Sequence, residues 1–407
     1  MKAPRSFCGR AREFAPFQAN AMNQPLPVTV LAGLPGAGKT TLVNHLLGGS
    51  HADHAGPRIA LVSGETDHVS NEIARLAARG NVDAIVVEAR GHDDPQSVAE
   101  NLVFDDDIAQ LDTVVTVIDA QNFPRDYAST AMLGHDEEGE RTVVETLVAQ
   151  VEFCDVIVIN KTDLIDKTAL AKLRDILHAL NPRAEIIGTQ FGVVPSKEVV
   201  NTDRFDFDAT SSAPGWLAML NAEPGATLIA ANESGIGGFV YRARRPFHPE
   251  RLWSLLHQEW TGVLRSKGFF WLATRSDIGG SLSQAGGALR HGPAGVWWAA
   301  QDRNEWPTGD AELEAEIAAD WFGDADDTSI GDRRQELAII GTALDEAHWR
   351  SAFDACLLTD EEWSLGAQAW ASFGDPFPSW EIDDHEDHEH GHDHGDECDC
   401  GAHGHDH

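Results

Sequence analysis

The sequence predicts an α/β protein: a mainly parallel, doubly wound sheet, then a smaller α+β domain and a disordered, histidine-rich tail. In the first half, short apolar runs alternate with helical stretches, a pattern typical of a parallel sheet covered on both faces. All 12 tryptophans lie at Trp216 or later, so the composition changes after the alternating region. The last 27 residues hold eight histidines and 11 acidic residues but no lysine or arginine. Such a composition cannot bury a core.

The strands and helices of the first domain follow one another in regular order. Residues 26–34 form a β-branched run that ends in Gly and Pro, as buried strands do. Residues 40–47 then have a helical pattern. Further strands are expected at 58–62, 84–87, 113–118, 156–159 and 184–187, and helices at 70–79, 141–153 and 168–180.

The second half has fewer regular signals. Strands are expected at 238–244, 268–274 and 295–299, with a helix at 249–260. We therefore divide the chain into a disordered leader with an alternative start at Met22, a nucleotide domain, a linker, a second domain and a tail. These segments are 1–25, 26–210, 211–234, 235–380 and 381–407.

The net charge and the cysteines exclude several classes of protein. The formal charge of −36 repels phosphate backbones and anionic lipid, so we expect neither nucleic-acid nor membrane partners. No apolar run approaches the roughly 20 residues needed to cross a bilayer. Five scattered cysteines do not make a disulfide framework, which favours a reducing cytoplasm.

Residues 33–40, GLPGAGKT, fit the phosphate-binding pattern G-x-x-x-x-G-K-[ST] between a predicted strand and a predicted helix. Backbone N–H groups of such a loop surround phosphate oxygens at a helix N-terminus. Lys39 should reach the β- and γ-phosphates, and the Thr40 hydroxyl should bind Mg²⁺. The expected nucleotide-binding residues of this loop are Gly33, Gly36, Ala37, Gly38, Lys39, Thr40 and Thr41.

The base is predicted from NKTD at residues 160–163, which follows a buried strand. Asp163 can accept hydrogen bonds from N1–H and the 2-amino group of guanine. Adenine offers no such pair of donors and leaves the carboxylate unpaired. Together with the phosphate loop, Asn160, Lys161 and Asp163 predict a GTP site.

A third group of candidates ends the strand at 84–87. Glu88 is placed to act on Mg²⁺ or its bound water, with the Gly91 N–H near the γ-phosphate. Glu88 therefore joins Lys39 and Thr40 as a predicted catalytic residue. Asp119, after the next strand, is expected to be structural.

With these motifs the chain resembles the CobW-related GTPases, a family linked to zinc homeostasis and metal-centre assembly. The resemblance covers roughly residues 26–380 and implies GTP hydrolysis with Mg²⁺. The blocks that carry it include LAGLPGAGKTTLVNHLL, VDAIVVEARGHDDP, QVEFCDVIVINKTDLI, GVLRSKGFFWLATR and GDRRQELAIIG.

Two features depart from the pattern of the family. The family usually carries a Cys-x-Cys-Cys motif in the interval that is residues 62–79 here, and this interval contains no cysteine. Arg90 stands where the family usually has Thr or Ser before the switch glycine. The resemblance therefore supports nucleotide binding more directly than metal transfer in the usual manner.

The tail supplies other metal ligands. Imidazole and thiolate groups suit Zn²⁺, although copper binds more tightly wherever it is available. An acidic, solubilising tail is the alternative. The predicted zinc ligands are His385, His388, His390, His392, His394, Cys398, Cys400, His403, His405 and His407.

Taken together, the sequence predicts a cytoplasmic GTPase that couples its nucleotide state to delivery of zinc, or another transition metal, to a client protein. Two alternatives remain open at this point. One is a zinc buffer or storage protein with a vestigial GTPase domain. The other is a client-specific metalloenzyme-assembly GTPase that carries no metal itself.

Overall fold

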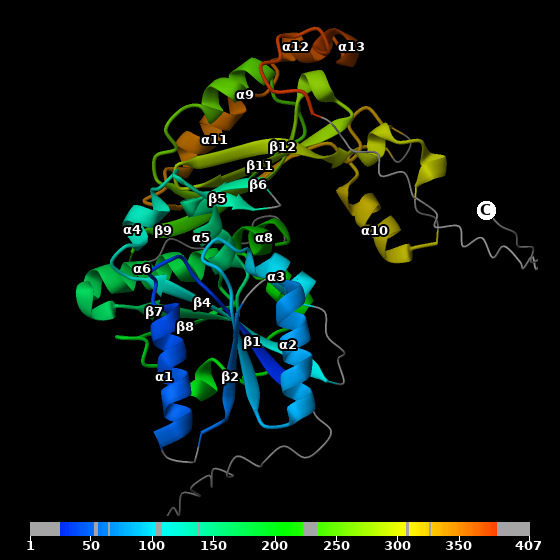
Figure 1. Ribbon diagram of the computed structural model, residues 1–407. Helices are drawn as coiled ribbons and strands as arrows, with labels where there is room; N and C mark the ends of the chain where they lie inside the picture. The colour runs from blue at the N-terminus through cyan, green and yellow to red at the C-terminus, as the bar shows by residue number, and fades with distance from the viewer. Residues whose placement is uncertain are drawn as a thin grey trace, which may run out of the picture.

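A computed structural model of the chain describes residues 25–52, 56–63, 66–102, 108–136, 139–222, 234–306, 309–324 and 327–380. Figure 1 shows these residues as a coloured ribbon. Residues 1–24 of the expected leader and the whole tail from 381 to 407 lie outside them. The tail's ten expected zinc ligands therefore remain a prediction from sequence.

Six strands form the sheet of the first domain. They are β1 Leu26–Ala32, β2 Ile59–Ser63, β3 Ala84–Glu88, β4 Ala109–Asp119, β7 Val156–Asn160 and β8 Glu185–Gly188. Their spatial order is β2-β3-β1-β4-β7-β8, and all neighbours pair in parallel. The expected parallel sheet is confirmed. β1 lies inside it, with the phosphate loop at its carboxyl end.

Helices cover both faces of this sheet. Their bounds are α1 Lys39–Ala52, α2 Thr66–Arg79, α3 Pro95–Asn101, α4 Phe123–Tyr127, α5 Val143–Glu152, α6 Lys167–Leu180, α7 Phe207–Ser211 and α8 Gly215–Leu220. An antiparallel hairpin, β5 Met132–Asp136 and β6 Gly139–Thr142, precedes α5. The α5 helix starts with a capping box, in which Thr142 and Glu145 satisfy each other's backbone N–H groups.

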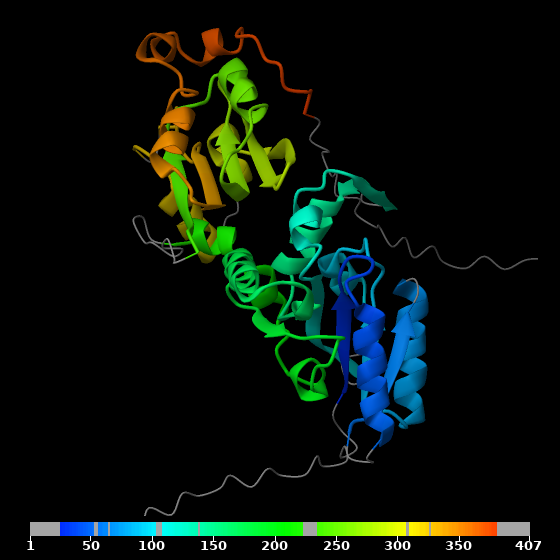
Figure 2. The same cartoon turned by 90° about the vertical axis from the view of Figure 1, so that its left-hand side faces the viewer.

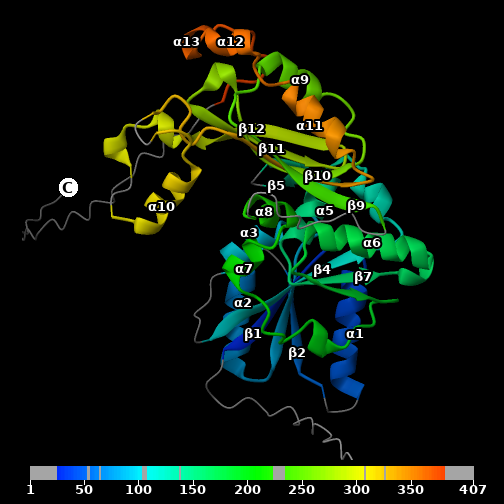
Figure 3. The ribbon, with the colours of Figure 1, turned by 180° about the vertical axis from the view of Figure 1, so that it is seen from behind.

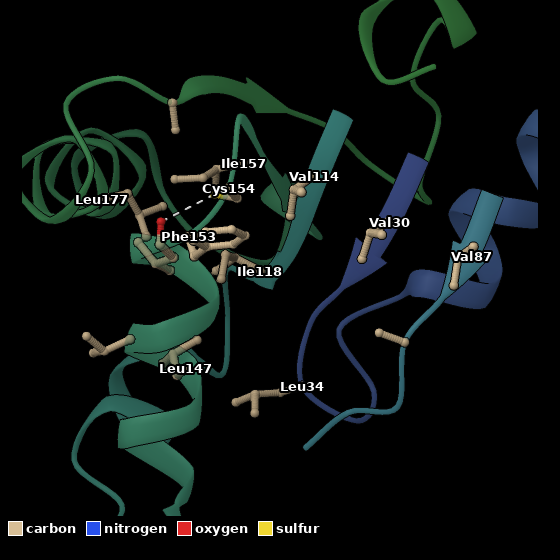
Figure 4. Packing of buried hydrophobic residues seen from close by; sticks show 14 of the residues in the cluster. Val30, Leu34, Val87, Val114, Ile118, Leu147, Phe153, Cys154, Ile157 and Leu177 are labelled. Carbon is tan, nitrogen blue, oxygen red and sulfur yellow. Dashed lines mark hydrogen bonds between the residues drawn. The ribbon is translucent and has the colours of Figure 1, made fainter. Parts of the chain in front are cut away.

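Successive side chains of β1 enter two separate cores. Val30 belongs to the cluster that also contains Leu34, Ile118 and Leu147 (Figure 4). Leu31 belongs to a second cluster on the other face, formed by the strands together with α1 and residues 194–200. Because strand side chains alternate between faces, a strand buried on both sides requires a mainly apolar run, and β1 is apolar except for the buried Thr29.

The second domain is built on an antiparallel sheet of five strands. They are β9 Ile236–Ala243, β10 Val263–Trp271, β11 Ile278–Ala285, β12 Ala288–Val296 and β13 Gln335–Thr342. Their order is β12-β11-β10-β13-β9. The helices are α9 Pro249–Leu256, α10 Ala311–Asp320, α11 Glu346–Asp354, α12 Asp360–Ser364 and α13 Ala367–Trp370. Side chains of α9 and α11 share a core with one face of this sheet.

The strand expected at 295–299 is wrong. β12 ends at Val296, and Trp298–Ala300 is a 3₁₀ turn. The reason is Asp332, whose carboxylate accepts hydrogen bonds from the backbone N–H groups of Trp298 and Ala299, both at 2.9 Å. These groups therefore bond to a side chain and do not extend a strand pair.

The other face of the antiparallel sheet lies toward the first domain. Helices α5, α6 and α8 lie between the two sheets (Figures 1 and 3), and α8 contacts β10 and β13. The view turned by 90° shows the two sheets as separate layers (Figure 2). Among the described residues, no helix is long and apolar enough to cross a membrane.

Candidate functional site

The parallel sheet brings the predicted nucleotide-site motifs to one edge. The phosphate loop follows β1, Glu88 is the last residue of β3, Asp119 ends β4 and Asn160 ends β7. These four strands are neighbours in the order β3-β1-β4-β7. In open α/β sheets, ligands bind outside the carboxyl ends of the strands where the strand order reverses, and here the order reverses at β1.

The phosphate loop has a backbone that only glycine fits at one key position. Gly38 has φ +108°, and a Cβ there would lie 2.1 Å from the Nδ2 atom of Asn160. The same Nδ2 atom donates to the Ala37 carbonyl at 3.0 Å. The glycine therefore allows the side chain after β7 to hold the loop after β1.

Lys39, the first residue of α1, carries its ammonium group back over this loop. Its Nζ donates to the Gly33 carbonyl at 2.5 Å. Burial lowers the pKa of Lys39, whereas the carboxylates of Glu88 and Asp93 oppose this shift. The carboxylates help to keep this half-buried ammonium group charged, and a charged ammonium group can pair with an anion such as a phosphate.

Thr40 and Glu88 fit a magnesium site. The Thr40 hydroxyl, in the first turn of α1, donates to the carboxylate of Glu88 at the end of β3, at 3.2 Å. Mg²⁺ prefers oxygen ligands and commonly takes one or two protein groups together with phosphates and waters. These two residues can hold the ion directly or through its bound water.

Lys161 connects the predicted guanine motif to the phosphate loop. Its backbone is left-handed, with φ +59°, and its Nζ donates to the Gly36 carbonyl at 2.8 Å and to Asp119 at 2.6 Å. Burial favours the neutral acid at Asp119, but hydrogen bonds from Lys161 and Asn122 outweigh it and lower the pKa of Asp119. The contact agrees with the expected structural role of Asp119.

A loop after β8, which the sequence analysis did not single out, completes this side of the site. The Gly192 N–H donates to the Asn160 Oδ1 at 3.0 Å, and the Thr162 hydroxyl donates to the Thr189 carbonyl at 2.9 Å. Asp163 is exposed beside this contact. The sequence TQFG after a predicted strand was the available signal.

The segment from Arg90 to Asp94 lies against the phosphate loop. A Cβ at Gly91 would lie 2.6 Å from the Pro35 ring, so only glycine permits this approach. The Arg90 guanidinium pairs with Asp93 at 3.0 Å and is largely exposed. Gln150 of α5, which the sequence analysis also missed, donates to the carbonyls of Gly91 and Asp93 at 3.2 and 3.1 Å.

The described part of the chain contains no group of three or more His, Cys, Asp or Glu residues placed to hold a metal ion. The interval where the family usually carries cysteines is mostly α2, which begins at Thr66. No transition-metal site is therefore assigned within these ranges.

Comparison with known proteins identifies the family. The nucleotide-binding domain of CobW/HypB/UreG matches residues 27–70 and 65–188, and the cobalamin synthesis protein cobW C-terminal domain matches residues 236–357. The zinc-regulated GTPase metalloprotein activator 1 of Dictyostelium discoideum is 32% identical over 413 residues, which cover 87% of this chain and 84% of that protein. The chain belongs to the CobW GTPase family.

Two further proteins are similar to this chain. The zinc chaperone Rv0106 of Mycobacterium tuberculosis is 32% identical over 327 residues, covering 76% of this chain and 75% of that protein. The crystal structure of Zn(II)-bound YjiA GTPase from E. coli is 20% identical, covers 82% of this chain and 100% of that chain, and gives a TM-score of 0.37. The expected family, fold class and GTPase activity are confirmed.

Proposed function

We propose that this GTPase couples its nucleotide state to the handling of a transition metal, with zinc as the metal and a client metalloprotein as the recipient. The observation that carries the proposal is similarity along most of the chain to proteins named as a zinc-regulated GTPase metalloprotein activator and a zinc chaperone. The sequence adds a tail with eight histidines and two cysteines, groups that suit zinc.

The phosphate side of the proposed site uses the loop after β1. Its backbone N–H groups surround the phosphates, from Gly33 to Thr41, and Lys39 neutralises charge on the β- and γ-phosphates. The Thr40 hydroxyl and the Glu88 carboxylate, 3.2 Å apart, hold Mg²⁺. When bound by these two residues, Mg²⁺ would supply positive charge against the negative charge that develops on the phosphates during transfer. The Gly91 N–H is directed to the γ-phosphate.

The base side of the proposed site uses the ends of β7 and β8. Asp163 accepts the two guanine donors, while Lys161 and Asn160 hold the phosphate loop in place through the carbonyls of Gly36 and Ala37. Because one loop is fixed to the other, the distance between base and phosphates is set before GTP binds. Such preorganisation reduces the entropic cost of binding.

The metal part of the proposal is tested by zinc titration of the full chain with GDP or with a non-hydrolysable GTP analogue. We expect zinc affinity to differ between the two states by at least about fivefold, the lower end of usual allosteric coupling. A variant with the eight tail histidines changed to Asn and the two tail cysteines to Ser should lose this difference. Equal zinc affinity in both states would contradict the coupling and favour storage or assembly without carried metal.

The Lys39→Ala variant tests the nucleotide part separately. Loss of the ammonium that faces the phosphates should lower GTP turnover by about 100-fold or more and remove the effect of nucleotide on zinc affinity. Lys172→Ala, an exposed lysine of α6, is the matched control and should behave as wild type. Unchanged turnover in Lys39→Ala would overturn the assigned phosphate site.

A further inference from the structure

Helix α5 contacts the nucleotide-site segment 90–94 on one side and the antiparallel sheet on the other. On the side of α5 that faces the nucleotide site, Gln150 is fully buried, and its Nε2 donates to the carbonyls of Gly91 and Asp93. Just before the helix, Arg141 pairs with Asp94 at 2.6 Å. The segment that follows β3 is thus attached to α5 by a buried amide, and by an ion pair to the end of β6, which leads directly into α5.

The opposite side of α5 is attached to the second domain by two carboxylates. Glu152 pairs with Arg265 of β10 through both oxygens, at 2.7 and 3.2 Å, and both side chains are less than 10% exposed. Glu145 pairs with Arg290 of β12. Arg265 also donates to the Ser283 hydroxyl at 2.9 Å, so its guanidinium is fixed within the sheet.

Helix geometry explains why these contacts fall on different sides. Glu145 and Glu152 are seven residues apart, which is close to two turns and places them on the same face. Gln150 precedes Glu152 by two residues, a rotation of about 200°, and therefore lies on nearly the opposite face. A displacement of segment 90–94 thus acts on one face of a rigid element whose other face holds two arginines of the sheet.

We propose that α5 transmits the nucleotide state to the antiparallel sheet, with Gln150 as the positioning residue at the input and the Glu152–Arg265 pair at the output. The inference rests on the proposed function, because it uses the Gly91 N–H as the group that meets the γ-phosphate. It adds the route by which that contact reaches the second domain. The hydrogen bonds of the Gln150 Nε2 go to the carbonyls of Gly91 and Asp93, so Gln150 acts through the position of Gly91 rather than on the nucleotide.

The tryptophans of the chain can report a shift of Arg265 through their fluorescence. All 12 tryptophans lie at Trp216 or later, so tryptophan fluorescence arises outside the sheet that binds the nucleotide. Trp216 of α8 lies 4.5 Å from the Lys267 ammonium. Lys267 is two residues from Arg265 on β10, and alternate strand residues share a face. A shift of Arg265 should therefore alter the surroundings of Trp216.

The test compares the full chain with GDP and with a non-hydrolysable GTP analogue, by tryptophan fluorescence and by amide hydrogen exchange of residues 263–271. We expect exchange in wild type to differ at least about fivefold between the states. Gln150→Leu should lose this difference and lower kcat about tenfold while KM changes less than threefold, because the proposed ground-state nucleotide contacts remain. Gln110→Leu, the same change at an exposed position of β4, should behave as wild type.

A second variant removes the Glu152–Arg265 ion pair without leaving one of the two charges buried and unpaired. The double variant Glu152→Gln with Arg265→Gln should lose the exchange difference and keep kcat within about threefold, since these side chains bond to each other and to the antiparallel sheet rather than to the nucleotide site. Two results would overturn the proposal: wild type that hydrolyses GTP with identical exchange in both states, or Gln150→Leu that retains the difference. Either result leaves the nucleotide-site assignment standing, because that assignment is tested separately, by turnover in Lys39→Ala.

Discussion

The nucleotide pocket and the contact between the two domains use polar groups in opposite ways. In the pocket, the partly exposed ammonium groups of Lys39 and Lys161 donate to loop carbonyls. At the domain contact, the Arg265 guanidinium is 4% exposed and pairs through two nitrogens with Glu152. A cation of the first kind remains accessible to a ligand, whereas the second kind binds only protein.

This difference predicts whether a substitution in each region will mainly change nucleotide binding and turnover or mainly change folding stability. Removing a pocket cation should affect binding or turnover more than folding, because water can solvate the carbonyls that it leaves. Removing one member of a buried pair leaves an uncompensated charge in a low-dielectric interior, which is strongly destabilising. The two regions should therefore respond to substitution in different measurements.

The largest expected effect is on stability, at Arg265. Arg265→Met should lower the free energy of unfolding by about 3–5 kcal/mol, since the Glu152 carboxylate stays buried without its partner. Chemical denaturation followed by tryptophan fluorescence measures this loss.

Arg290→Met is the matched control for Arg265→Met. It breaks the other pair between α5 and the sheet, but this guanidinium is 53% exposed. Exposed pairs contribute little, so the expected loss is below about 1 kcal/mol. Similar losses in the two variants would contradict the distinction between buried and exposed attachments of α5.

The next largest expected effect is on nucleotide affinity, when Asp163 of the proposed base site is changed. Asp163→Asn replaces the proposed acceptor of two guanine donors, so GTP affinity should fall roughly 100-fold. Xanthosine triphosphate, which has a carbonyl in place of the 2-amino group, should bind the variant more tightly than it binds wild type. Competition binding with the two nucleotides measures both changes.

Asp166→Asn provides the control for this prediction. Asp166 caps α6 by accepting from the Ala169 N–H at 2.8 Å, and Asn caps helices equally well. The same chemical change three residues away should leave nucleotide selectivity unaltered. Equal selectivity in Asp163→Asn and wild type would remove Asp163 from the base site.

The sequence could predict that the two motifs of the proposed site meet, because their signals are local. Residues 33–40 and 160–163 each form a short pattern after a β-branched run, and parallel strands bring such runs to one edge. The partners at the domain contact are 113 and 145 residues apart in the chain. Nothing near Arg265 indicates that its charge meets Glu152, although both lie in blocks that resemble the family.

The same reasoning explains what was missed in detail. Gln150 is a polar residue in a mainly apolar helix, which is a signal, but its partners at Gly91 and Asp93 become adjacent only after the sheet forms. The strand expected at 295–299 failed because Asp332, more than 30 residues later, captures the backbone N–H groups. In each case the local structure depends on a residue far away in the sequence, and a local sequence pattern carries no information about that residue.

The smallest expected effect concerns an ion pair of intermediate exposure, between Arg251 and Glu362. The hydrogen bond from Arg251 is the main reason that the pKa of Glu362 falls from 4.5 to about 2. A carboxyl whose pKa is lowered on folding stabilises the protein above its ordinary pKa and loses this contribution as the pH falls toward the folded value. The contribution should therefore be present above pH 4.5 and disappear between pH 4.5 and about 2.

Glu362→Gln isolates this contribution because glutamine carries no charge at any pH. Since the Glu362 side chain is 25% exposed and solvent screens the pair, we expect wild type to exceed the variant by less than about 1 kcal/mol at pH 7. The difference should shrink as denaturation is repeated at lower pH. The absence of any difference at pH 7 would mean that Glu362 stabilises through its capping contacts with Thr359, which glutamine can also make, rather than through its charge. The pair would then be unlike Glu152–Arg265 in kind as well as in burial.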